Sequence, residues 1–106
     1  MSDEEALALV LREGSGEDAL CVALRGFPGP TAERVWRVAE ACGIVARSSA
    51  GSASLPRELA AAVLGLTYHT ECQWSESRHH GVEYEVGFDE AMIALTDAAC
   101  GIIETP

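Results

Sequence analysis

The chain has 106 residues, a formal net charge of −10 and 48% hydrophobic residues. This length suits one compact domain and is too short for two, so residues 1–106 are expected to form a single domain. The hydrophobic content excludes global disorder, and the negative charge disfavours nucleic acid as a partner. No run of about 18 apolar residues is present, which predicts no membrane insertion. Acidic residues stand where a signal peptide would need basic ones, so we expect a cytoplasmic protein.

The four cysteines are dispersed along the chain, with no CxxC pair among them: Cys21, Cys42, Cys72 and Cys100. Each lies in an apolar stretch, which is typical of reduced thiols in the core of a cytoplasmic protein. No cofactor-binding pattern accompanies them, so no cofactor is expected.

The first segment, residues 2–13, allows two interpretations. Ser2 stands three residues before Glu5, which is a capping-box pattern, and Gly14 is a helix stop, so local propensity favours a helix. Leu7, Leu9 and Leu11 also alternate with smaller apolar residues, as in a buried strand.

The next stretch reads as a strand, a turn and a helix. Residues 18–26 form a short apolar run between turn signals, which predicts a buried strand. The loop that follows has no GxGxxG or GK[ST] motif, and Pro28 and Pro30 remove two amide donors, so it is expected to turn the chain without binding phosphate. Residues 31–42 show helical apolar spacing up to Gly43, and residues 44–48 predict another strand.

The second half predicts two helices around a hairpin. Residues 56–66 are expected to form a helix capped by Ser54 and Pro56. Residues 82–88 alternate clearly between apolar and polar, which predicts a half-buried strand that could pair with residues 67–74. Asp89 is expected to cap a helix that runs to Cys100, and residues 101–106 suit an edge strand. The predicted fold is therefore α/β, a small mixed sheet covered by two to three helices.

A succession of short segments in the first two thirds of the chain resembles the cytoplasmic domain of the FlhB/YscU family of flagellar and type III secretion export proteins. Within residues 6–68, the matching stretches are residues 9–12, the turn at 16–19, the apolar run at 22–26, the helix "AERVWRVAEACGI" at 32–44 and "LPRELAAAVLGLTY" at 55–68. The resemblance implies that residues 6–11 form a strand paired with residues 20–24. It also implies a role in protein export. Residues 69–106 have no counterpart in it.

The same resemblance carries no catalytic residue across to this chain. The family cleaves itself at an Asn-Pro-Thr-His motif, and no such motif occurs here. The implied role is therefore that of a non-enzymatic protein-interaction module, a stand-alone relative of the export-gate domain, whose partner is an export component or a second copy of itself.

Two clusters in residues 69–85 are candidate sites. His69, Cys72, His79 and His80 carry metal-ligand chemistry, but their spacing matches no standard motif, so a small metal-dependent or thiol enzyme is the alternative function. A homo-oligomer subunit is a further alternative. The strand at 82–88 is expected to present a binding edge to a partner strand, formed by Glu83, Glu85, Arg78 and Trp74.

Trp36 allows two interpretations, since it lies beside the apolar stripe of the helix at 31–42 and between Arg34 and Arg37. It can pack at the rim of the core, or it can serve as an exposed anchor for a partner.

Overall fold

A computed structural model describes residues 1–26 and 28–104. Within these residues every element is helical: α1 (Asp3–Ser15), α2 (Leu20–Ala23), α3 (Ala32–Ser48), α4 (Arg57–Leu64), the π-helical segment η1 (Gly65–His69), α5 (Thr70–His79) and α6 (Phe88–Glu104). No strand occurs in this part of the chain, so the predicted α/β fold with a mixed sheet is wrong. None of these helices is long and apolar enough to cross a membrane.

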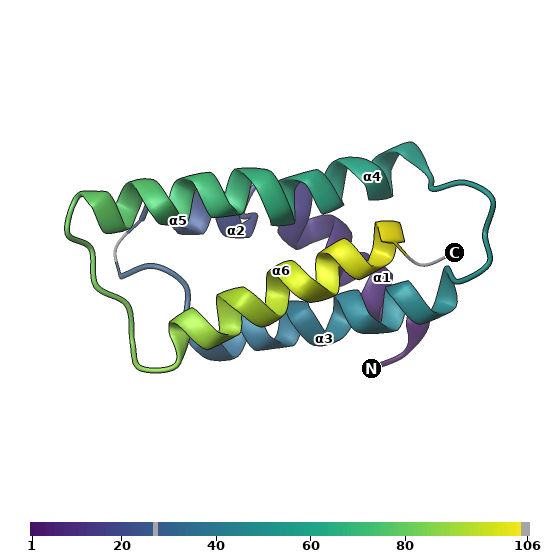
Figure 1. The fold of residues 1–106 in the computed structure, drawn as a ribbon, viewed down its shortest axis with the longest axis horizontal. Helices are drawn as coiled ribbons and strands as arrows, with labels where there is room; N and C mark the ends of the chain where they lie inside the picture. Colours follow the sequence, from purple (N-terminus) through teal and green to yellow (C-terminus); the bar gives the residue numbers. More distant parts are fainter. Residues whose placement is uncertain (27, 105–106) are drawn as a thin grey trace.

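The helices form an elongated bundle of 42 × 22 × 21 Å. The α4, η1 and α5 segments follow one another without a break and make one long rod along one side of the molecule (Figure 1). On the other side, α3 and α6 run in the same direction as each other and opposite to the rod (Figure 1). The α1 helix packs against both α3 and α4, so it joins the two sides.

The core lies where apolar stripes at helical spacing meet. The buried stripe of α3 consists of Val35, Val38, Cys42 and Val45, and α6 contributes Phe88, Met92, Leu95, Ala99 and Ile102. Spacings of three and four residues place each set on one face of its helix. The contact between α3 and α6 is the most extensive in the molecule.

The tightest contact joins α1 to the rod through two glycines. A Cβ atom added to Gly65 would lie 1.9 Å from the carbonyl oxygen of Gly14, and one added to Gly14 would lie 2.3 Å from that of Ala62. The backbones touch here because neither glycine has a side chain. Gly65 also begins the π-helical segment, where its carbonyl accepts a hydrogen bond of 2.6 Å from the buried Thr70 hydroxyl. Such segments are rare and usually occupy one turn within an α-helix.

The first segment is a helix, as local propensity favoured. Both bonds of the Ser2–Glu5 capping box are present at 3.1 Å, so this prediction is confirmed. The strand at 6–11 implied by the FlhB/YscU resemblance is therefore wrong. The predicted strand at 18–26 is wrong as well, because residues 20–23 form the short helix α2 and bury Leu20 against the bundle. The resemblance thereby loses the pair of strands that supported it.

The three other predicted strands are wrong for separate reasons. Residues 44–48 continue α3, because Val45 extends the buried stripe past Gly43. Residues 67–74 belong to the rod, whose buried positions Leu66, Thr70 and Trp74 are four residues apart. The segment at 82–88 is mainly a loop, since Gly81 and Gly87 bracket it with φ of 84° and 89° and no strand lies beside it.

The last residues also differ from their prediction. Gly101 does not end α6, which continues to Glu104 instead of giving way to an edge strand; residues 105–106 lie outside the described part of the chain.

The three helices predicted from apolar spacing are confirmed, although each is longer than predicted. The helix at 31–42 extends to Ser48, that at 56–66 continues into the rod, and that at 89–100 is α6. The apolar faces of these helices pack against other helices and not against a sheet, as the buried residues Val35, Val38, Leu59 and Val63 show.

Replacing Gly65 by alanine should destabilise the protein by more than about 2 kcal/mol, because the new methyl group would overlap the backbone of Gly14. Gly101→Ala is the matched control, since nothing lies within 4 Å of its added Cβ. This control should gain roughly 0.5–1 kcal/mol from helix propensity. Urea unfolding measures both, and equal effects of the two substitutions would contradict the glycine contact.

Candidate binding groove between α1 and α3

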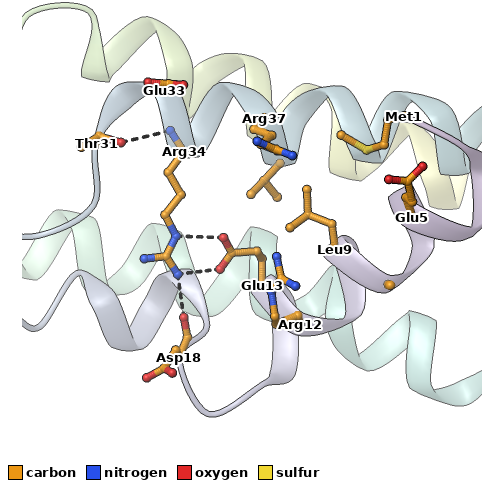
Figure 2. A pocket seen from close by; sticks show the side chains of 12 residues that line it. Met1, Glu5, Leu9, Arg12, Glu13, Asp18, Thr31, Glu33, Arg34 and Arg37 are labelled. Carbon is orange, nitrogen blue, oxygen red and sulfur yellow. Dashed lines mark hydrogen bonds and ion pairs between the residues drawn. The ribbon is translucent and has the colours of Figure 1, made fainter.

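An open groove of about 790 Å³ lies between α1 and α3. Its lining includes Ala8 and Leu9 of α1 and Val38 of α3. Its charged lining includes Arg12, Arg34 and Arg37 (Figure 2). We call it the α1/α3 groove. It contains three of the seven basic side chains of a chain that has arginine and no lysine.

The lining of the groove includes a buried carboxylate, that of Glu13, which is paired with Arg34. Glu13 is 5% exposed, and Arg34 donates to it from Nε at 2.8 Å and from Nη2 at 2.6 Å. Arg34 Nη2 also donates to the backbone carbonyl of Asp18 at 2.6 Å, which ties the segment after α1 to α3 (Figure 2). The hydrogen bonding that Arg34 donates to the Glu13 carboxylate is the main reason that the pKa of Arg34 is raised. Bidentate pairs of this kind fix geometry as well as charge.

The two other arginines of the groove are not held in this way. Among the described residues, neither Arg12 nor Arg37 makes a side-chain hydrogen bond or an ion pair. Glu5, at the same groove, has a lowered pKa, caused first by its hydrogen bond from the Ser2 backbone and only weakly by the distant charge of Arg37. Figure 2 shows Arg12 and Arg37 reaching into the groove from the two helices. Both guanidinium groups are available to a ligand.

An exposed tryptophan extends the groove. A second hollow beside it is lined by Trp36, Glu40, Met1, Glu5, Glu33 and Arg37, and the last four of these also line the α1/α3 groove. Trp36 is 48% exposed, so of the two interpretations given to it the structure supports the exposed anchor.

The four residues predicted to form a binding edge do not lie on a strand. Trp74 is 7% exposed and packs against Phe88. The Arg78 guanidinium lies 4.3 Å from the centre of the Trp74 ring. Glu85 accepts a hydrogen bond from the backbone N–H of Ala32, where a carboxylate stabilises the start of α3. Glu83 is exposed in the loop. A binding edge that needs unpaired strand backbone is therefore absent from the described residues.

The histidine and cysteine cluster is divided between two places. His69 and Cys72 line a small groove beside α2, whereas His79 and His80 lie at the end of α5, where His80 Nε2 is 2.9 Å from Glu76. In the described part of the chain, no three or more His, Cys, Asp or Glu side chains are placed to hold a metal ion.

The cysteines differ in burial, so the expectation of four core thiols is wrong. Only Cys42 is buried, Cys21 and Cys100 are half-buried, and Cys72 is exposed. Burial raises the pKa of the Cys42 thiol to about 12.

Comparisons with protein-family models, with curated proteins and with solved structures found no significant match to this chain. By its fold and its site, this chain is a small helical bundle with an open groove lined by arginine and a neighbouring hollow lined by tryptophan. Sequence reasoning missed the α1/α3 groove because Arg12 lies far from Arg34 and Arg37 in the chain. The exclusive use of arginine as the basic residue was the available signal, since arginine is the residue that makes bidentate contacts to carboxylates.

Arg34→Met should cost about 3 kcal/mol, because it leaves the Glu13 carboxylate buried without its partner. The double variant Glu13→Leu/Arg34→Met should recover most of this loss, since it removes both charges. Urea unfolding of the two single variants and the double variant measures the coupling. A loss below about 1 kcal/mol for Arg34→Met would contradict the buried pair.

Cys42 should make the protein less stable at alkaline pH. Its pKa is raised from 9.0 to about 12 on folding, so the folded state keeps the proton that the unfolded state releases. The contribution of the protonated Cys42 thiol to the free energy of unfolding is fully present below pH 9 and is lost as the pH rises from 9 to about 12. The fall in unfolding free energy over this range should be smaller in Cys42→Ala. Parallel curves for the two proteins would contradict the assignment.

Proposed function

We propose that this protein is a non-enzymatic protein-interaction module whose α1/α3 groove binds an acidic, amphipathic segment of a partner protein. The observation that carries the proposal is a groove lined by Arg12 and Arg37, two guanidinium groups that have no partner within the described residues, next to a hollow that shares Arg37 and contains the exposed Trp36. Tryptophan and arginine are the residues most enriched among those that dominate binding energy at protein interfaces.

The distribution of charge supports a carboxylate-bearing ligand. The chain as a whole carries −10, yet three of its seven arginines line this one groove. Four acidic residues also line the groove: Glu13 is paired with Arg34, Glu5 is engaged with Ser2 in the capping box, and neither Asp18 nor Glu33 forms an ion pair with Arg12 or Arg37. A carboxylate side chain of the partner can therefore form charge-assisted hydrogen bonds with them.

The shape of the groove supports an amphipathic segment. Its lining includes small and aliphatic side chains from two helices, Ala8, Leu9 and Val38, and the neighbouring hollow adds the exposed Trp36. This arrangement fits an amphipathic helix, which places apolar residues into a groove and keeps charged residues at its rim.

The proposal includes a cytoplasmic location, which is supported by the acidic composition and by the four free cysteines. It does not include the export-related partner that the FlhB/YscU resemblance implied, because the strands supporting that resemblance are helices or loop in this protein.

A photo-crosslinking amino acid at position 36, introduced in cells of the source organism, tests the proposal. Position 93 is the matched control, because Ile93 is an apolar residue on α6 that is also exposed, at 61%. We expect an adduct with a second protein from position 36 only, and we expect Arg12→Glu/Arg37→Glu to abolish it. Arg57→Glu, an exposed charge reversal outside the groove, should leave the adduct in place.

An adduct of twice the mass of the chain would identify the partner as a second copy and would make the protein a homo-oligomer subunit. Equal adducts from positions 36 and 93, or an adduct that survives reversal of both groove arginines, would contradict the proposal. For the purified complex, Trp36→Ala should weaken binding about 30-fold or more, as expected when a central tryptophan is lost.

A further inference from the structure

A second groove, of about 540 Å³, brings two cysteines that are 51 residues apart in the sequence to one place. It lies between α2 and α5 and is lined by Cys21 and Arg25 on one side and by His69, Cys72, Gln73 and Glu76 on the other. The proposed function makes no use of this groove or of either thiol.

The register of α2 on the rod is fixed by two hydrogen bonds. Arg25 Nε donates to Gln73 Oε1 at 3.0 Å, and the Ser77 hydroxyl donates to the Leu24 carbonyl at 3.2 Å. Since α2 also packs against η1, it runs in the same direction as the rod, with its beginning near η1 and its end near Ser77. Cys21 lies one turn before Arg25, so it is level with the turn of the rod that carries His69, Cys72 and Gln73.

We propose that Cys21 and Cys72 form a peroxide-oxidisable thiol pair that closes into a disulfide between α2 and α5. Cys72 is the exposed thiol and the half-buried Cys21 faces the same groove, so Cys72 reacts first and Cys21 resolves it. His69, three residues before Cys72, lines the same groove.

The chemistry consists of two displacements at sulfur. The Cys72 thiolate attacks the O–O bond of a hydroperoxide, forms a sulfenic acid and releases water, or an alcohol if the peroxide is organic. The Cys21 sulfur then attacks the Cys72 sulfur, and the departing hydroxide takes a proton and leaves as water. The two thiols lose two electrons in total, and the peroxide is reduced by two electrons.

The cysteine positions make the product easy to assign. Trypsin cuts after arginine, so Cys21 falls in the peptide 13–25, Cys42 in 38–47, Cys72 in 58–78 and Cys100 in 79–106. No two cysteines share a peptide, and each linked pair therefore identifies one disulfide.

The experiment treats the reduced full-length protein with hydrogen peroxide and follows intact mass and tryptic peptides. We expect a loss of about 2 Da and a link between peptides 13–25 and 58–78. Cys100→Ser should leave this link unchanged, whereas Cys21→Ser should abolish it and leave the sulfenic acid on Cys72, detectable with a dimedone probe. In guanidinium chloride the pairing should lose its selectivity, because it depends on the folded register.

Absence of the link between 13–25 and 58–78 in the folded protein, or links to Cys100 in equal amount, would overturn the proposal. A dimedone adduct on Cys21 in Cys72→Ser, formed as fast as that on Cys72 in Cys21→Ser, would overturn the order of reaction.

Discussion

The backbone contact between Gly14 and Gly65 determines where α1 lies, and the α1/α3 groove depends on that position. Because a Cβ on Gly65 would fall 1.9 Å from the Gly14 carbonyl oxygen, α1 and the rod touch at a distance that no other residue allows. The same glycine starts the π-helical turn, in which the Thr70 hydroxyl satisfies the Gly65 carbonyl. Two structural irregularities therefore meet at one residue, whose carbonyl accepts hydrogen bonds from both the backbone N–H and the hydroxyl of Thr70.

The position of α1 in turn places the residue next to Gly14 against α3. Glu13 is buried there and is compensated by Arg34, which also holds the carbonyl of Asp18 and so directs the chain toward α2. The ion pair uses one arginine of the α1/α3 groove and leaves Arg12 and Arg37 without an ion pair among the described residues. The turn that begins at Gly65 also carries His69, and Cys72 follows within one turn. The groove between α2 and α5 therefore depends on this region of the rod as well.

The parts of the fold that were predictable are those that a local pattern determines. The Ser2–Glu5 capping box and the buried stripe of Val35, Val38 and Cys42 were both recognised from spacing. Residues 82–88 do alternate between apolar and polar, but a strand forms only beside a partner strand. In the folded chain this segment lies at the start of α3, where Glu85 accepts a hydrogen bond from the Ala32 N–H. Gly14 was read as a helix stop, although its function is a contact with a residue 51 positions away. Contacts of this kind leave no periodic signal, and the groove that depends on them was missed for the same reason.

Nuclear magnetic resonance of the isotopically labelled protein tests the central claim, that a glycine-to-glycine crossing organises an all-helical bundle. The account predicts helical Cα secondary shifts without interruption from Asp3 to Ser15 and from Arg57 to His79, together with nuclear Overhauser contacts between the Hα protons of Gly14 and Gly65. Extended-chain shifts at residues 6–11 and 20–24 with cross-strand contacts between them, or the absence of any contact between Gly14 and Gly65, would contradict it.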